Sequence, residues 1–218
     1  MKPPPLERTV LAGPAGPLEA VVSEPADGES TTRSFAVVCH PHPLYGGTLD
    51  NKVIHTLARA FAACGAATIR FNFRGVGTSA GTFDEGRGET EDALAVIAYG
   101  QARWRGAALW LAGFSFGGAV AVHAAARSAP ARMVLVAPGI TRVTMQDVPS
   151  PPCPWLLIQG DADEVIDSAQ VLHWAARQSV APTLRRFPDT GHFFHGRLHE
   201  LRAAVTQFIC PANAGAAG

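Results

Sequence analysis

The chain contains 218 residues, of which 47% are hydrophobic and 17% charged, and its 18 basic residues balance 18 acidic ones. This apolar content excludes intrinsic disorder, and the length suits one domain of about 200 residues with a core of two or three layers. The balanced charge favours neither a nucleic-acid partner nor a membrane partner. We expect a single domain over 1–218, with an ordered core at about 9–210 and a flexible tail at 211–218.

The cysteines and the first residues indicate the cellular compartment. The four cysteines lie at 39, 64, 153 and 210, and no two have the spacing of metal ligands. In a chain of this size we interpret all four as reduced, buried, small apolar residues. The first residues lack the apolar core of a signal peptide, and no apolar run approaches the ~18 residues of a membrane span. We therefore expect a soluble, cytoplasmic protein.

Short apolar segments rich in branched residues alternate along the chain with segments of helical length. This alternation predicts a mostly parallel β-sheet with helices on both faces. A short antiparallel pair at 9–12 and 18–24 comes first, and a polar loop at 25–34 follows it. The later predicted strands lie at 35–39, 67–72, 107–111, 132–136, 155–159 and 183–187, and the predicted helices lie at 50–64, 90–102, 117–128, 168–179 and 196–209.

The pattern G-x-S-x-G occurs twice, at 77–81 around Ser79 and at 113–117 around Ser115. A nucleophile elbow needs a strand directly before the serine and a helix directly after it, because that tight turn lifts the hydroxyl above the sheet. Ser115 lies between a predicted strand and a predicted helix, whereas Ser79 lies in a glycine-rich loop. We therefore predict that Ser115 is the nucleophile.

Acidic residues follow the predicted strand at 155–159, and a histidine, His192, follows the last predicted strand. A serine nucleophile needs a base to accept its proton and an acid to orient that base, which follow in the order Ser, Asp, His in sheets of this kind. Asp163 lies where the loop turns back over the strand end, so we prefer it to Asp161 as the acid. Asp167 is better suited to cap the next helix.

Two further patterns offer alternative chemistry. His192, His195 and His199 have helical spacing and 40–42 forms an H-x-H pair, but neither set brings convergent carboxylates or cysteines. Residues 75–80 match G-x-G-x-x-A, yet further glycines follow, whereas a dinucleotide fingerprint opens directly into a helix. We expect no metal and no cofactor.

An oxyanion hole needs two backbone N–H groups, one from the residue after the nucleophile and one from the loop after the third strand. The first residue is Phe116. The second lies in the loop at 40–47, where the two prolines cannot donate, which leaves His42 or Leu44. The sequence does not distinguish between these two donors.

Aromatic side chains lie close to these motifs and predict an apolar acyl or alcohol group on the substrate. We expect Tyr45, Phe114 and Phe193 to contact the substrate. A position in the hydrophobic core is an equally good interpretation for Phe114 and Phe194.

Together, these motifs resemble the α/β-hydrolase family, and in particular its small lidless bacterial serine esterases. The resemblance spans about residues 9–210 and implies a sheet of eight strands, mostly parallel, with the second strand antiparallel. The stretches that carry the resemblance are 40–47, 70–79, 113–117, 160–163 and 191–194.

The same resemblance implies a Ser115–His192–Asp163 triad that hydrolyses small apolar carboxylic esters through an acyl-enzyme. Cap domains of this family usually enter after the sixth strand. Residues 137–154, with four prolines at 149–154, cannot build a helical cap, so we expect an open site. Thioesterases, acyltransferases and peptidases with the same triad are alternatives, as is a non-catalytic binding protein on the same fold.

Overall fold

The computed structural model describes residues 6–25 and 32–211. Most of the predicted polar loop, 26–31, and most of the predicted tail, 212–218, therefore lie outside the described residues. No helix within the described ranges is long and apolar enough to cross a membrane.

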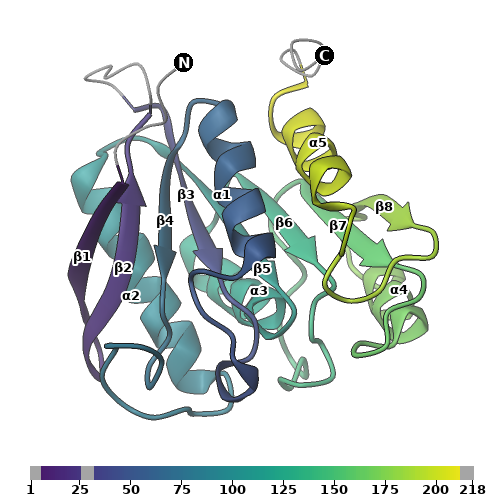
Figure 1. The fold of residues 1–218 in the computed structure, drawn as a ribbon, viewed down its shortest axis with the longest axis horizontal. Helices are drawn as coiled ribbons and strands as arrows, with labels where there is room; N and C mark the ends of the chain where they lie inside the picture. The colour runs from purple at the N-terminus through teal and green to yellow at the C-terminus, as the bar shows by residue number, and fades with distance from the viewer. Residues whose placement is uncertain (1–5, 26–31, 212–218) are drawn as a thin grey trace.

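A sheet of eight strands runs through the described part of the chain (Figure 1). Its strands are β1 (Leu6–Gly13), β2 (Gly16–Ser23), β3 (Ser34–Cys39), β4 (Ala67–Phe71), β5 (Ala108–Phe114), β6 (Arg132–Val136), β7 (Trp155–Gly160) and β8 (Thr183–Phe187). They lie in the order β1-β2-β4-β3-β5-β6-β7-β8. β2 pairs antiparallel with β1 and β4, and the other neighbours are parallel. The predicted sheet is confirmed.

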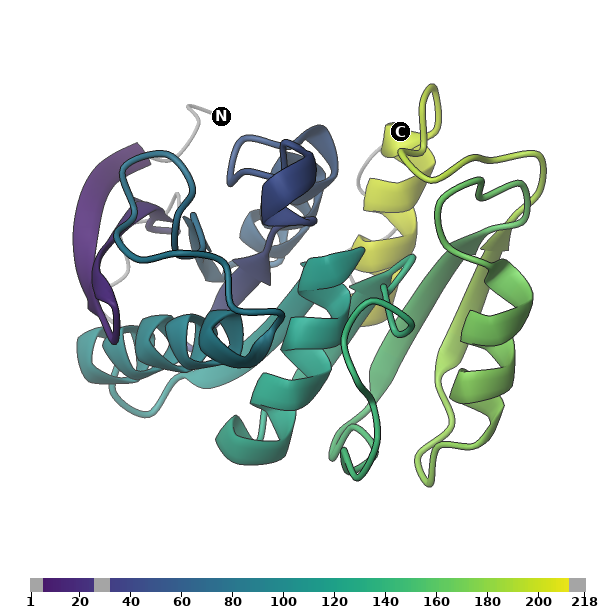
Figure 2. The ribbon, with the colours of Figure 1, turned by 90° about the horizontal axis from the view of Figure 1, so that it is seen from below.

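Five α-helices in the described ranges cover the sheet on both faces, as predicted. In the view of Figure 2, α1 (Lys52–Ala63) and α5 (Leu198–Ile209) lie above the sheet. Below it lie α2 (Arg87–Arg103), α3 (Phe116–Ser128) and α4 (Ser168–Ala176). The central strands are continuous apolar runs because both of their faces are buried, and β3 is buried along its whole length.

Alternation along β5 separates two hydrophobic layers. Leu111 packs into the layer under α2 and α3, whereas Phe114 packs into the layer under α1 and α5. β5 extends three residues past its predicted end, to Phe114, and α3 begins at Phe116. Ser115 is thus the one residue between a buried strand and a buried helix, as a nucleophile elbow requires.

The connection between β6 and β7, residues 137–154, contains no helix. Its proline-rich sequence predicted this result. This connection therefore forms no helical cap over the carboxyl ends of the strands.

Cys64 and Cys210 form a disulfide, so the prediction of four reduced cysteines is wrong. The two residues are the C-caps of α1 and α5, which pack side by side, and their Cα atoms are 5.9 Å apart (Figure 1). They are 146 residues apart in the sequence, so their spacing gives no indication of the pairing. The other two cysteines, Cys39 and Cys153, are free and buried as predicted.

Candidate active site

Ser115 occupies a strained position above the carboxyl end of β5. Its φ and ψ are 55° and −124°, a conformation that is costly for a residue with a side chain. Glycines two positions before and after it make the turn possible. A Cβ atom on Gly113 would overlap the carbonyl oxygen of Gly117, and one on Gly117 would overlap that of Cys39. The G-x-S-x-G pattern at this site therefore has a steric cause.

The other G-x-S-x-G serine, Ser79, is buried in a loop and is fully engaged. Its Oγ accepts a hydrogen bond from the backbone N–H of Glu19 at 2.9 Å and donates one to the carbonyl of Asn72 at 2.8 Å. These bonds tie β2 to the loop after β4. Ser79 thus connects two segments of the fold and presents no free hydroxyl.

The structure brings Ser115, His192 and Asp163 together from the ends of three parallel strands, β5, β8 and β7. His192 Nε2 lies 3.0 Å from Ser115 Oγ, and His192 Nδ1 lies 2.8 Å from Asp163 Oδ2. The side chains of His192 and Asp163 are 2% and 0% exposed. With the proton on Nδ1 donated to the carboxylate, Nε2 is free to accept the proton of Ser115.

The Asp163 carboxylate accepts hydrogen bonds at both oxygens. Oδ1 accepts from the backbone N–H groups of Val165 and Ile166 at 2.9 and 2.8 Å, and Oδ2 accepts from Gln159 Nε2 at 3.2 Å and from His192. Burial favours the neutral acid, but the hydrogen bonds from His192 and the two backbone groups outweigh it and lower the pKa of Asp163 below its usual value. This carboxylate is ionised at neutral pH.

The competing acids of the same loop have other partners. Asp161 accepts a hydrogen bond from Arg186 Nε at 2.8 Å, and Asp167 caps α4 by accepting from the N–H of Ala169. The cap predicted for Asp167 is confirmed by these contacts. Neither carboxylate is hydrogen-bonded to His192.

The loop after β3 is held in place by a buried histidine, His40. Its Nδ1 donates to the carbonyl of Pro41 at 2.6 Å, and its Nε2 accepts from the backbone N–H of Phe73 at 3.0 Å. Burial lowers the pKa of His40 to about 4, so the ring is neutral and can serve as donor and acceptor at once. This tie fixes the residues that follow, including His42.

Of the two candidate oxyanion donors in this loop, Leu44 is already engaged. Its N–H donates to His42 Nδ1 at 3.2 Å, and its side chain is 66% exposed. Within the described ranges, the N–H groups of His42 and Phe116 have no hydrogen-bond acceptor. The expectation for Leu44 is therefore wrong, because its N–H caps the histidine ring beside it.

A cavity of about 370 Å³ opens beside Ser115. Ser115, His192, His42 and Phe116 line it, and Tyr45 and Phe193 lie at its edge with 79% and 42% exposure. Both aromatic residues line the cavity, and their contact with a substrate stays a prediction.

Comparisons with known proteins agree with this fold. A protein family described as serine aminopeptidase, S33, matches residues 37–152, just over half of the chain. The chain belongs to this family of α/β-hydrolases. It is similar over nearly its full length to an α/β serine hydrolase without a lid from Xanthomonas campestris, with 43% identity, coverage of 97% and 96% of the two chains and a TM-score of 0.89.

Two more relatives of this α/β-hydrolase extend the similarity. A homologue of α/β serine hydrolases from Coxiella burnetii is 39% identical, with 92% and 96% of the two chains covered and a TM-score of 0.87. An uncharacterised protein from Rickettsia prowazekii is 30% identical over 207 residues, which are 90% of this chain and 86% of the relative. The predicted family is confirmed, and so is the absence of a cap domain within residues 6–25 and 32–211.

Phe114 does not line the cavity of this hydrolase, so the prediction that it contacts substrate is wrong. Its side chain is fully buried because this position of β5 faces the layer under α1 and α5. Its ring packs against the imidazole of His192, with centroids 4.8 Å apart. Phe194 is also fully buried in that layer, so the core interpretation is right for both residues.

Glu164, which was not predicted from the sequence, supports the loop of the hydrolase that carries His192. Its Oε2 accepts a hydrogen bond from the backbone N–H of His192 at 3.1 Å. The only signal was its position beside Asp163 in a loop rich in acids. Arg142, which lines the cavity, was missed as well, because nothing local to its segment indicates that it reaches the site.

The histidines at 192, 195 and 199 do not form a cluster. His192 is buried, with both ring nitrogens in contact with Ser115 and Asp163, whereas His195 and His199 are exposed. In the described parts of the chain, no three His, Cys, Asp or Glu side chains are placed to hold a metal ion.

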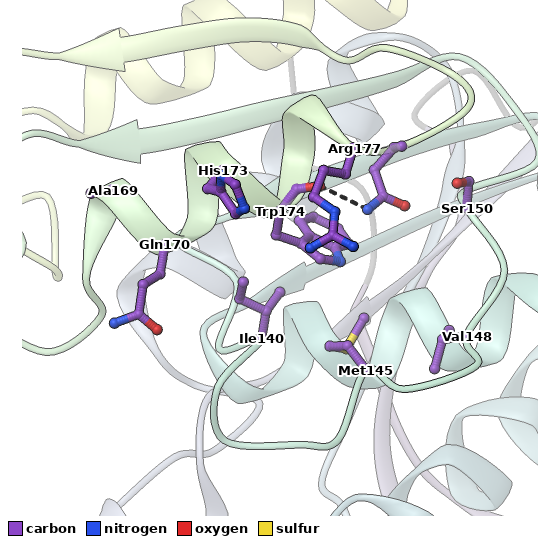
Figure 3. A pocket seen from close by; sticks show the side chains of 10 residues that line it. Ile140, Met145, Val148, Ser150, Ala169, Gln170, His173, Trp174 and Arg177 are labelled. Carbon is purple, nitrogen blue, oxygen red and sulfur yellow. Dashed lines mark hydrogen bonds between the residues drawn. The ribbon is translucent and has the colours of Figure 1, made fainter.

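A larger hollow of about 640 Å³ lies between α4 and residues 140–150 (Figure 3). Figure 3 shows His173 and Trp174 of α4, together with Arg177 at the end of that helix, on one side and Met145 on the other. None of the predicted catalytic residues lines this hollow. The smaller cavity beside Ser115 is therefore the candidate active site.

Proposed function

We propose that this α/β-hydrolase cleaves carboxylic esters through Ser115, His192 and Asp163. The observation that carries the proposal is the unbroken hydrogen-bonded series from Ser115 Oγ through His192 to Asp163, beside an open cavity. Ser115 Oγ attacks the ester carbonyl carbon while His192 Nε2 accepts its proton. Asp163 keeps the imidazole in the required tautomer and stabilises the imidazolium that forms.

The negative charge that develops on the carbonyl oxygen needs donors that are already oriented. The free N–H groups of Phe116 and His42 are the proposed pair. Phe116 opens α3, whose N-terminus carries a partial positive charge, and His40 holds the loop of His42 in place. Such donors stabilise the transition state without reorganisation.

The proton held by His192 then passes to the leaving alcohol, and the acyl group stays on Ser115. A water molecule attacks this acyl-enzyme while His192 accepts its proton, and the acid product leaves as Ser115 is restored. The uncapped site gives water direct access to the acyl carbon. The apolar edge formed by Tyr45, Phe193 and Val165 favours small apolar acyl or alcohol groups.

The family description includes aminopeptidases, and the cavity argues against that reaction for this chain. An aminopeptidase must hold the positively charged amino group of its substrate, for which a carboxylate is the suitable partner. In the part of the chain that the structure describes, no Asp or Glu lines the cavity, whereas Arg142 does. An ester substrate without a cationic group agrees better with this lining.

A hydrolysis screen tests the proposal. Short-chain 4-nitrophenyl esters, acyl thioesters and aminoacyl 4-nitroanilides are compared at equal concentration, with Ser115→Ala as the control. We expect the oxygen esters to give the highest kcat/KM and Ser115→Ala to be inactive on them. Higher kcat/KM on nitroanilides would favour a peptidase, and higher kcat/KM on thioesters a thioesterase.

The cytoplasm was the expected compartment, and that expectation rested on four reduced cysteines. The disulfide between Cys64 and Cys210 removes this basis, because disulfides form and persist mainly in oxidising compartments. A cytoplasmic location therefore stays a proposal that the cysteines do not support. Alkylation of cells quenched and lysed directly in acid and denaturant tests it, because the denatured cytoplasmic protein with reduced thiols would be alkylated at all four cysteines and the disulfide-bonded protein only at Cys39 and Cys153.

A further inference from the structure

The active-site cavity contains one positive charge that has no partner. Arg142 lines the cavity together with Ser115 and is exposed to solvent. Its guanidinium makes no hydrogen bond and no ion pair with any side chain in the described ranges, unlike Arg74, which pairs with Asp92 at 2.8 Å. An unpaired guanidinium at the wall of a binding cavity is available to a ligand.

The backbone fixes Arg142 relative to the nucleophile. The N–H of Gly139 donates to the carbonyl of Ser115 at 2.8 Å, and the N–H of Arg142 donates to the carbonyl of Gly139 at 2.9 Å. Two hydrogen bonds therefore connect the backbone of Arg142 to that of Ser115. The segment is also packed tightly there, because a Cβ atom on Gly139 would lie 3.1 Å from the backbone nitrogen of Phe116.

Two other side chains of the cavity wall, His42 and Asn51, also offer hydrogen-bond donors. His42 Nδ1 accepts from Leu44, so the ring carries its proton on Nε2. Burial, followed by the positive charge of Arg142, lowers the pKa of His42 and keeps that ring neutral. Asn51 Oδ1 is engaged with the N–H of Val53, which leaves its amide NH₂. Among the residues that the structure describes, no carboxylate side chain lines the wall, so a ligand anion would meet these donors and no like charge.

We infer that the preferred esters of this enzyme carry a carboxylate in addition to the ester group, and that Arg142 binds it. The planar guanidinium matches a carboxylate with two parallel hydrogen bonds. The inference rests on the proposed esterase function and adds a specificity-determining residue to it. Arg142 does not take part in the bond-breaking steps, because it binds a group remote from the reacting carbonyl.

Two pairs of esters locate the carboxylate on either side of the scissile bond. For the acyl side, mono-4-nitrophenyl adipate is compared with 4-nitrophenyl hexanoate. For the alcohol side, 4-carboxyphenyl butyrate is compared with its neutral methyl ester, with release of the phenol as the readout. Spontaneous hydrolysis is subtracted in each case. We expect kcat/KM of the wild-type enzyme to be about fivefold higher or more for the anionic ester of at least one pair, mainly through a lower KM.

Variants assign the preference to Arg142. In Arg142→Gln the ratio of kcat/KM for anionic over neutral ester should fall at least fivefold, and Arg142→Lys should restore part of it. Arg177→Gln is the matched control, because it removes the same charge from an exposed arginine in the other hollow and should leave the ratio as in the wild type.

Each outcome decides between the two proposals. If neutral esters are hydrolysed as well as anionic ones in both pairs, the inference is wrong and the esterase function stands. A preference that survives in Arg142→Gln excludes Arg142 as its cause. If the folded wild-type enzyme hydrolyses none of the four esters, the esterase proposal itself is overturned.

Discussion

The carboxylate of Glu164 accepts a hydrogen bond from the backbone N–H of His192, 3.1 Å away, and so reaches the proposed base without touching its ring. Glu164 is a positioning residue in this account. Its neighbour Asp163 orients the imidazole, whereas Glu164 holds the loop that carries it. The two acids are adjacent in sequence and contact different parts of the same histidine.

Removal of the Glu164 side chain should lower activity through the position of His192. We expect Glu164→Ala to reduce kcat about tenfold with little change in KM, because near-attack geometry depends on the base. Glu164→Gln keeps an acceptor oxygen and should recover most of the activity. The two variants are compared in steady-state kinetics, and equal kcat for both would argue against the role of this hydrogen bond.

The Asp163→Asn variant should fold like the wild type but hydrolyse esters far more slowly. Asp163→Asn removes the charge that selects the imidazole tautomer, and we expect a decrease in kcat on the order of 10⁴. Asp161→Asn is the control from the same loop and should cost far less, because Asp161 pairs with Arg186 at the surface. Wild-type kinetics for Asp163→Asn would assign the acid to another residue.

Features of the site could be predicted from the sequence when the residues that form them are adjacent in the chain. The elbow was predictable because a strand, a serine and a helix follow one another directly, and parallel strand ends must meet at one edge of the sheet. By contrast, the hydrogen bond from the N–H of Leu44 to His42 Nδ1 lies within a loop, and no periodic pattern in the sequence predicts it. The orientation of Phe114 depended on which face of β5 lies beneath His192.

Contacts between segments that are distant in the chain could not be predicted either, because no local sequence pattern encodes them. Cys64 and Cys210 meet because α1 and α5 pack side by side on one face, and no pattern in the chain specifies that contact. Arg142 reaches the cavity because its segment is tied to the backbone of Ser115 through Gly139. Both features follow from tertiary packing.

The disulfide should stabilise the fold without affecting catalysis. Cys64 and Cys210 end helices whose C-termini lie at the edge of the sheet away from Ser115 (Figure 1). We expect the double variant Cys64→Ala, Cys210→Ala to lose about 2–5 kcal/mol of unfolding free energy in urea, since the bond closes a long loop in the unfolded chain. Its kcat/KM should match the wild type. Alkylation of the purified, denatured, unreduced enzyme should label two cysteines, and labelling of four would contradict the bond.

Buried His40 should make the fold sensitive to mild acid. Its pKa is about 4 in the fold, below the ordinary value of about 6.5 expected in the unfolded chain. The unfolded state therefore binds more protons between these values, so stability is fully present above pH 6.5 and falls as the pH drops toward 4. This one group should remove about 2 kcal/mol of unfolding free energy between pH 7 and pH 5.

Urea unfolding of wild type and His40→Gln at pH 7 and pH 5 measures that contribution. The glutamine variant lacks the titrating ring, so the loss between the two pH values should be about 2 kcal/mol smaller than in the wild type. An equal loss in both proteins would show that His40 does not titrate differently in the folded and unfolded states.

The central claim is that Ser115, activated by His192, is the nucleophile. A fluorophosphonate reacts covalently with such a serine, and peptide mass spectrometry identifies the labelled residue. The account predicts a label on Ser115 in the wild type and in Ser79→Ala, no label in Ser115→Ala, and strongly slowed labelling in His192→Ala. A label on Ser79, or a folded wild-type enzyme whose Ser115 does not react, would contradict it.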